Sequence, residues 1–195
     1  MKIISKKPLW EGKFLRSSLI KYTPSGGEPH DPSGQQTQQG AAGKIWEWES
    51  VDRVNCPGVV AIVPFTDNNE VLLIRQFRPP VNGYVIELPA GLCETGESLE
   101  EAAARELLEE TGYAAARMKF LIKGPMSSGL TSEILAVFVA TGLTFSGEAE
   151  SDETEEIEVL TVPEDRVAAT LYALQAAGNY IDLKLFGLIG IARSA

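Results

Sequence analysis

Acidic residues gather between residues 91 and 113 at a spacing that could hold a divalent cation. The segment reads GLCETGESLEEAAARELLEETGY. In a helix, at about 100° per residue, Glu106 and Glu110 lie one turn apart on one face, with Glu109 beside them. Three carboxylates in one small patch repel each other unless a cation neutralises them, and hard oxygen ligands suit Mg²⁺ or Mn²⁺ rather than zinc. The sequence therefore predicts a Mg²⁺ or Mn²⁺ site on this helix.

The residues around these carboxylates suggest how the site is built. The turn Leu88-Pro89-Ala90-Gly91 precedes the segment, and the glycine permits a close approach that brings the Ala90 carbonyl to the same metal. Arg105 is placed to brace Glu97 across the junction of loop and helix rather than to bind substrate. The apolar residues Ala104, Leu107 and Leu108 are expected to face the core.

The whole segment fits a single pattern, G-x5-E-x7-R-E-U-x-E-E-x-G-U, in which U is a bulky apolar residue. Its fixed positions are Gly91, Glu97, Arg105, Glu106, Glu109, Glu110 and Gly112. A chance match has a probability on the order of one in a billion per starting position. The pattern is the Nudix box, and the chain resembles the Nudix hydrolases. A solvated, alanine-rich helix would carry similar charges, but the glycine and glutamate at fixed offsets before the helix favour metal binding.

Further segments resemble the ADP-ribose and ADP-sugar pyrophosphatase branch of that family. They are RQFRPP at 75–80, ELPAG at 87–91, EGKF at 11–14 and WESV at 48–51. The resemblance implies that Arg53 and Arg78 hold the diphosphate of a nucleotide sugar, and that Glu87 lies near its terminal ribose. It also implies that Trp48 stacks on adenine and that Phe14 supplies a second aromatic ring. The alternatives are cross-strand packing for Trp48, a core position for Phe14, and an ion pair of Arg53 with Asp52 or Glu49.

The loop SSGLTSE at 127–133 also resembles that branch. It implies substrate contacts from Gly129 and Leu130. Ser128 stands where the branch usually carries a proline, which leaves other nucleoside diphosphate sugars as alternative substrates.

The box glutamates are expected to bind metal, and Glu109 is counted as a catalytic residue as well. A general base must therefore come from elsewhere. The acidic loop at 150–156 is the natural source, because a mobile loop can close over bound substrate. By resemblance Glu155 fits best, with Glu153 and Glu156 as alternatives. The expected reaction is hydrolysis of ADP-ribose to AMP and ribose 5-phosphate. The alternatives are another substrate, such as GDP-mannose or a dinucleoside polyphosphate, or a non-catalytic module that senses ADP-ribose.

Short runs rich in β-branched residues predict the strands that position these side chains. They span 14–22, 45–54, 58–65, 70–77, 84–88, 134–141 and 157–162; helices are expected at 98–111, 164–176 and 182–193. These elements indicate an α/β or α+β class with mixed strand pairing. The resemblance implies a Nudix α/β/α sandwich in residues 57–195. It further implies an N-terminal antiparallel sheet in residues 1–56 that forms a homodimer, with a polar loop at 24–43.

Charge and composition exclude several other classes. The 195 residues include 17 Lys and Arg against 27 Asp and Glu, for a formal net charge of −10. Such a chain repels nucleic acid and anionic membranes. Two cysteines are too few for a disulfide scaffold or a zinc cluster. No apolar run is long enough to span a bilayer, so we expect a cytoplasmic protein. The resemblance implies that its substrate is a small nucleotide sugar.

Overall fold

The computed structural model describes residues 1–23, 44–147 and 156–194. The chain forms two compact units. Unit 1 comprises Met1–Asn55 together with Pro125–Glu133, and unit 2 comprises Cys56–Gly124 together with Ile134–Ala195. The loop at 125–133 therefore groups with the N-terminal strands, although it is more than 70 residues from them in sequence.

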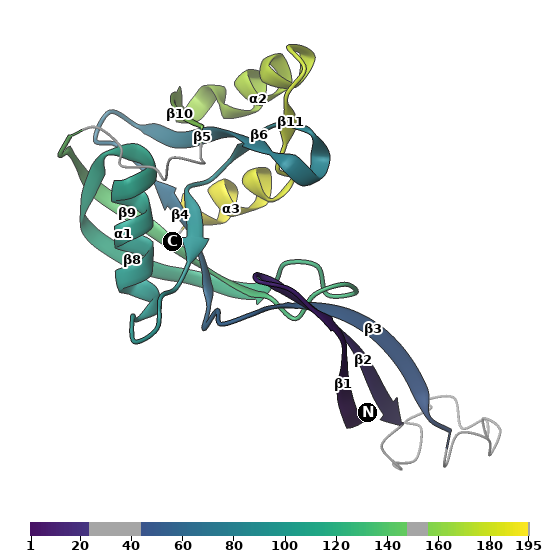
Figure 1. Cartoon of the computed structure of the whole chain (residues 1–195). Coiled ribbons are helices and arrows are strands. Elements are labelled where there is room, and N and C mark those ends of the chain that lie inside the picture. Colours follow the sequence, from purple (N-terminus) through teal and green to yellow (C-terminus); the bar gives the residue numbers. More distant parts are fainter. Residues whose placement is uncertain (24–43, 148–155, 195) are drawn as a thin grey trace, which may run out of the picture. The chain divides into compact units, whose positions relative to one another are not determined.

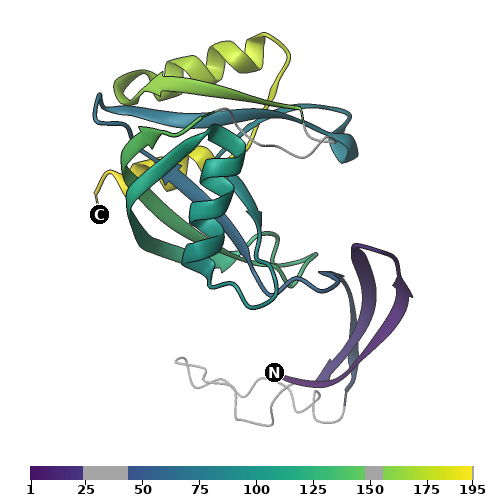
Figure 2. The ribbon, with the colours of Figure 1, turned by 60° about the vertical axis from the view of Figure 1, so that its left-hand side comes forward.

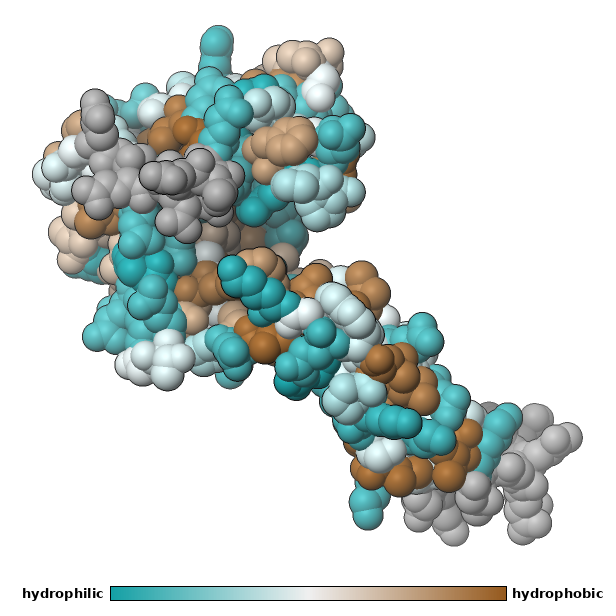
Figure 3. All heavy atoms as spheres, in the orientation of Figure 1, coloured by the Kyte–Doolittle hydropathy of each residue, from teal (hydrophilic) through white to brown (hydrophobic). Residues whose placement is uncertain are grey.

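Unit 1 is built on a three-stranded antiparallel sheet. Its strands are β1 (Lys2–Glu11), β2 (Leu15–Thr23) and β3 (Trp46–Arg53), in the order β1-β2-β3. The strands predicted at 14–22 and 45–54 are confirmed, but the sequence analysis missed β1. That strand lies at the sheet edge, where a proline such as Pro8 is tolerated. Every residue in it is exposed, so it lacks a buried apolar face to mark it. Hydrophobic side chains interrupt the polar surface of these strands (Figure 3).

Unit 2 contains two four-stranded sheets with mixed pairing. One has the order β7-β4-β9-β8, and the other has the order β10-β5-β6-β11. The strands are β4 (Val59–Pro64), β5 (Glu70–Arg78), β6 (Gly83–Glu87), β7 (Ala90–Leu92), β8 (Tyr113–Pro125), β9 (Ile134–Phe145), β10 (Ile157–Pro163) and β11 (Tyr180–Ile181). β4 runs parallel to β9 and antiparallel to β7, and β6 runs parallel to β11. The predicted α/β class with mixed pairing is confirmed, with the pairing divided between two sheets.

Three α-helices cover these sheets (Figures 1 and 2). They are α1 (Leu99–Thr111), α2 (Val167–Ala176) and α3 (Lys184–Ala192), and 3₁₀ turns occur at Pro79–Val81 and Glu164–Arg166. Helix α1 packs against β4 and β7, while α2 and α3 lie on opposite faces of the β10-β5-β6-β11 sheet. None of the helices in the described part of the chain is long and apolar enough to cross a membrane.

Local sequence signals fix both ends of α1. The Ser98 Oγ accepts a hydrogen bond from the Glu101 N–H, and the Glu101 carboxylate accepts one from the Ser98 N–H, which is a capping box. At the other end Gly112 adopts φ of 74°, the left-handed conformation that the sequence predicts for it. These caps set which residues of the segment lie on each turn of the helix.

The buried face of α1 differs from the expected one. Leu107 is buried against β4 and β9 in a cluster with Ala102 and Ala103, as a core residue should be. Ala104 and Leu108, however, are exposed, and Glu110 is buried instead. The helix is rotated relative to the expectation because a backbone N–H of the neighbouring strand binds the Glu110 carboxylate and keeps it inside.

Candidate active site

The Glu110 carboxylate anchors α1 to the turn before it. This side chain is 5% exposed, and its Oε2 accepts a hydrogen bond of 2.8 Å from the Ala90 N–H. Ala90 is held in turn by β4, whose residue Ala61 is its partner across the strand pair. Pairing with β4 therefore positions the Ala90–Gly91 backbone against the acidic face of α1.

Gly91 is required by the closeness of this approach. A Cβ built on Gly91 would lie 1.9 to 2.2 Å from the carboxylate atoms of Glu106, much closer than any real contact. Only glycine lets the backbone lie flat against that carboxylate. Two of the predicted metal-binding glutamates, Glu106 and Glu110, thus meet the same short stretch of backbone, from 90 to 91.

Arg105 holds the remaining acids of the box together. Its guanidinium makes two hydrogen bonds to Glu97, of 2.9 and 3.0 Å, and one each to Glu106 at 2.9 Å and Glu109 at 2.8 Å. It also donates to the Leu92 carbonyl. The hydrogen bond from Arg105, joined by one from the Glu94 N–H, lowers the pKa of Glu97. The predicted bracing of Glu97 across the loop–helix junction is confirmed, and the same arginine also neutralises two acids of the helix.

Arg78 and Glu87 meet on neighbouring strands of unit 2. The Arg78 Nε and Nη2 donate to the two Glu87 oxygens at 2.8 and 2.9 Å, which is a bidentate ion pair between β5 and β6. The structure thus brings together two side chains that the resemblance placed at the diphosphate and the terminal ribose.

Gln76, two residues before Arg78 on β5, is a feature to which the sequence analysis gave no role. Its side chain is 3% exposed, and its Oε1 has no hydrogen-bond partner within the described part of the chain. A buried amide oxygen without a donor is unusual. The RQFRPP motif contains this glutamine, but an unsatisfied oxygen shows only in three dimensions.

Unit 1 gathers four of the predicted substrate residues along β3. The Trp48 Nε1 donates to the Gly129 carbonyl at 3.0 Å, the Val51 N–H donates to the Leu130 carbonyl at 2.8 Å, and Arg53 forms an ion pair with Glu133. The loop at 125–133 is therefore held along β3 from Trp48 to Arg53. Arg53 pairs with neither of the partners considered from the sequence, because Asp52 is taken by Lys6 and this loop supplies Glu133.

Trp48 presents an open aromatic surface. It is 49% exposed, and with Trp46 and Tyr22 it lines a hollow of about 810 Å³. Trp46 packs edge-on against Tyr22 at 5.5 Å between ring centroids. The indole hydrogen bond of Trp48 fixes the plane of its ring, and the exposed ring is suited to stacking on a flat base.

Phe14 lies elsewhere in the same unit. It is 65% exposed, so it is not a core residue, and its carbonyl accepts from the Val54 N–H. Trp48 instead faces Ile20 in the β2–β3 register. The two aromatic side chains are therefore not cross-strand neighbours within unit 1.

Two of the three candidate bases, Glu153 and Glu155, lie outside the described residues. Glu156 is described, directly before β10. Its Oε2 accepts a 3.0 Å hydrogen bond from the Tyr84 hydroxyl, and this bond raises the pKa of Tyr84. Register places the next residue, Ile157, opposite Gln76, so the end of the acidic loop lies beside the Arg78 strand.

Comparison with known proteins agrees with this geometry. The NUDIX domain family matches residues 55–182, which is more than half of the chain. The chain belongs to the Nudix family. It is a Nudix hydrolase, and the predicted family and enzyme class are confirmed.

Several relatives of the chain are named for ADP compounds. The Nudix chain is 38% identical to an ADP-ribose pyrophosphatase of Bacillus subtilis over 143 residues, which cover 67% of this chain and 75% of the relative. It is 32% identical to an ADP-sugar pyrophosphatase of Mus musculus over 204 residues, covering 94% and 84%. A crystal structure of an ADP compounds hydrolase superposes with a TM-score of 0.73 and 22% identity over 99% of this chain and 92% of that one, which shows the shared fold.

Nudix hydrolases in general use divalent metal ions, so the box must be tested as a metal site. Among residues 1–23, 44–147 and 156–194, no three acidic, cysteine or histidine side chains are arranged as a ready metal cluster. Two of the three helix acids, Glu106 and Glu109, are directed to Arg105. Carboxylate and backbone carbonyl oxygens are the ligands that suit a hard divalent cation. Here the Glu106 carboxylate lies so close to the backbone of Gly91 that a Cβ would not fit between them.

Proposed function

We propose that this Nudix hydrolase cleaves the diphosphate of a nucleoside diphosphate sugar in a metal-dependent reaction, with ADP-ribose giving AMP and ribose 5-phosphate. The observation that carries the proposal is the convergence of Glu106 and Glu110 on the Ala90–Gly91 backbone. The names of the bacterial and mouse relatives support the substrate class.

The cation is proposed to be Mg²⁺ or Mn²⁺, held by Glu106, Glu109, Glu110 and the Ala90 carbonyl. When bound, it would supply positive charge to the diphosphate oxygens and polarise the attacking water. Arg105 neutralises Glu106 and Glu109 in this structure, and a bound cation would take over that role.

The two arginines are proposed to bind the diphosphate. Arg53 donates to Glu133 through Nε, and a guanidinium has five N–H donors, so this ion pair leaves donors for a phosphate. Arg78 is oriented by its bidentate pair with Glu87, which we propose to lie near the terminal ribose. Fixed cations of this kind stabilise charge that develops in the transition state.

The general base is proposed to come from the acidic loop at 150–156, with Glu155 as the proposed residue and Glu153 or Glu156 as alternatives. To act as the general base, Glu156 would have to release the Tyr84 hydroxyl.

Trp48 is proposed to stack on adenine. Its indole N–H is held by the Gly129 carbonyl, and the Gly129–Leu130 turn would border the adenine ring. Phe14 is proposed as a second aromatic contact.

We further propose a homodimer formed through β1, β2 and β3. Isoleucine, leucine and tryptophan side chains of β1 are at least half exposed, namely Ile3, Ile4, Leu9 and Trp10, and exposed apolar patches of this kind mark interfaces. Light scattering should give about twice the chain mass of 21.1 kDa; a monomer at micromolar concentration would refute the dimer.

We propose the cytoplasm as the location, because Cys56 and Cys93 are both free thiols.

A product screen tests the substrate class. ADP-ribose, ADP-glucose, GDP-mannose, NADH and a diadenosine polyphosphate are each incubated with Mg²⁺, and the products are separated by anion exchange. The proposal expects AMP from the ADP-sugars, fastest from ADP-ribose. If GDP-mannose or the diadenosine polyphosphate is cleaved faster than ADP-ribose, that compound is the better substrate. Tight binding of ADP-ribose without any product would indicate a sensing module.

A further inference from the structure

Unit 2 contains a cavity that the proposed reaction does not use. Its volume is about 510 Å³, within the range of small-molecule sites. Strands β8 and β9, the turn between β4 and β5, and the end of α3 line it. The walls are therefore well-ordered sheet and helix rather than a single loop.

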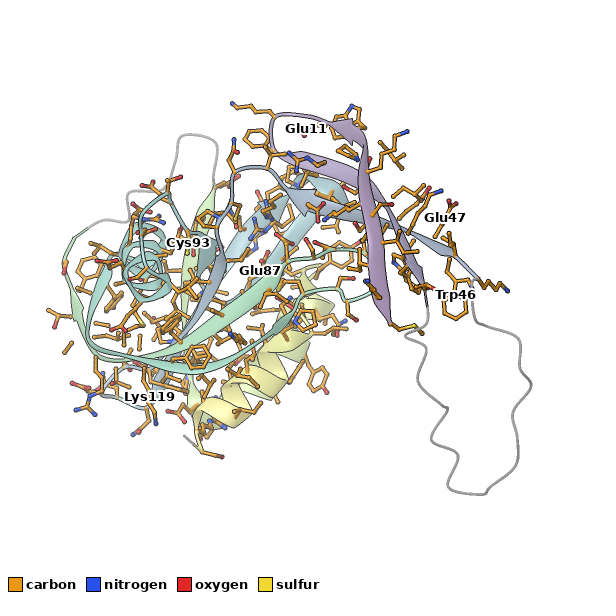
Figure 4. All side chains as sticks on the ribbon, turned by 90° about the horizontal axis from the view of Figure 1, so that it is seen from below. Glu11, Trp46, Glu47, Glu87, Cys93 and Lys119 are labelled. Atoms are coloured by element: carbon orange, nitrogen blue, oxygen red, sulfur yellow. The ribbon has the colours of Figure 1, made fainter. Side chains whose placement is uncertain are left out.

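The cavity lies on the face of the β7-β4-β9-β8 sheet opposite to α1. On β9, Phe138 and Ala140 belong to the core cluster under α1, whereas Val139 between them lines the cavity. On β8, Met118 packs against that same cluster, and its neighbours Arg117 and Lys119 line the cavity. Figure 4 shows Lys119 on the side of β8 and β9 away from α1, while Cys93 lies beside α1.

The charge of the lining is opposite to that of the chain. Arg117, Lys119 and Arg193 contribute three positive charges, and Glu164, which pairs with Arg193 at 2.9 Å, contributes one negative charge. A second carboxylate, Glu70, accepts a hydrogen bond from the lining residue Thr66 and adds one negative charge next to the cavity. The three cations therefore outnumber the two carboxylates there, in a chain whose formal net charge is −10. A local excess of cations in an acidic protein attracts anions to that one place.

The floor of the cavity is less polar than its rim. Val139 and Ala192 are buried, and Phe65 is half-buried beside them. Thr66 and Thr141, both half-buried, add hydroxyl groups to the lining. Such a surface complements a molecule with a charged end and a weakly polar body.

We propose that this cavity is a second binding site for a small organic phosphate monoester, separate from the Nudix catalytic site. A monoester carries a charge of about −1.5 to −2 at neutral pH, opposite in sign to the excess charge of the lining. Arginine and lysine side chains are the usual donors to phosphate oxygens. The volume is large enough for a nucleoside or sugar attached to the phosphate, which would lie on the floor formed by Phe65, Val139 and Ala192.

The test uses AMP as the probe and the full chain labelled with ¹⁵N. Amide shifts are followed during titration with AMP, with adenosine, which lacks the phosphate, and with inorganic phosphate, which lacks the body. We expect AMP to shift the amides of Thr66 and Thr141 in a saturable manner that added salt weakens. Separate shifts around Trp48 would report AMP at the proposed catalytic site and do not enter the fit.

The double variant Arg117→Gln/Lys119→Gln should weaken binding at the cavity by about tenfold or more, because it removes the charge-assisted donors. The matched control is Lys123→Gln, which removes an exposed cation of the same strand outside the cavity and should bind as the wild type does. Absence of shifts at Thr66 and Thr141 at millimolar AMP would overturn the proposal. So would equal binding by the double variant, or adenosine binding as tightly as AMP.

Discussion

Arg105→Met tests how the acids of the Nudix box are held together. The guanidinium of Arg105 joins Glu97, Glu106 and Glu109 through four hydrogen bonds of 2.8 to 3.0 Å. Methionine keeps much of the side-chain volume but removes every one of these donors. Three carboxylates are then left close together without the guanidinium that lies between them.

The magnitude follows from how far each partner is shielded from water. The side chains of Glu97 and Glu106 are 15% and 13% exposed, so each should lose about 1 kcal/mol, whereas the more exposed Glu109 should lose about 0.5 kcal/mol. The total is about 2 to 3 kcal/mol. For a chain of this size, that loss lowers the melting temperature by about 5 to 10 °C.

Magnesium should partly reverse this loss. In the wild type a cation must compete with Arg105 for Glu106 and Glu109, and in Arg105→Met it does not. Release of those two contacts corresponds to metal binding about 5- to 30-fold tighter in the variant, and tighter binding raises stability by linkage.

The assay is thermal unfolding in EDTA and in a Mg²⁺ titration. The control is Arg166→Met, which removes an exposed arginine from the 3₁₀ turn before α2 and should change the melting temperature by no more than about 1 °C. If Arg105→Met has the same melting temperature as the wild type in EDTA, the bracing role of Arg105 is refuted. A Mg²⁺ response no larger than that of the wild type would refute the competition.

Three further outcomes follow from the structure and the proposals. Trp48→Ala removes a stacking surface worth about 1–3 kcal/mol, so KM for ADP-ribose should rise about 5- to 150-fold while kcat changes little; an unchanged KM would exclude stacking. Glu155→Gln should lower kcat by about 10²- to 10⁴-fold with substrate binding retained, and full activity would move the base to another residue. Burial alone would raise the pKa of Asp52, but hydrogen bonds from Lys6 and two serines outweigh it and lower the pKa. Asp52 therefore stabilises unit 1 above the unfolded-state pKa of about 4, and this contribution is lost as pH falls through the lowered folded value. The acid unfolding curve of Asp52→Asn, followed by tryptophan fluorescence, should be flatter than that of the wild type.

Local sequence signals were enough to predict α1 and its acidic residues. Ser98 and Gly112 cap the helix through contacts within four residues, so both ends can be read from the chain. The spacing of Glu106 and Glu110 then follows from helix geometry. The direction in which α1 faces could not be read, because the Ala90 N–H that binds Glu110 comes from a different element.

Partners distant in sequence were the ones that the sequence analysis missed. Arg53 pairs with Glu133, which is 80 residues away, and no local pattern marks that contact. Strand β8, which contains three alanines and several basic residues, has weak strand propensity and was missed; it is ordered by pairing with β9. The RQFRPP and ELPAG motifs did indicate residues that meet, since the Arg78–Glu87 pair joins the two.

The most direct test of the proposed reaction is ³¹P NMR of ADP-ribose incubated with the full chain and Mg²⁺. Hydrolysis should make the diphosphate resonances disappear and two phosphate monoesters, AMP and ribose 5-phosphate, appear in equal amounts. We also expect no turnover in excess EDTA, and a loss of turnover of at least about 10²-fold in Glu110→Gln, which removes charge from a proposed metal ligand. Persistence of the diphosphate with Mg²⁺ present, or hydrolysis that continues undiminished in EDTA, would contradict it.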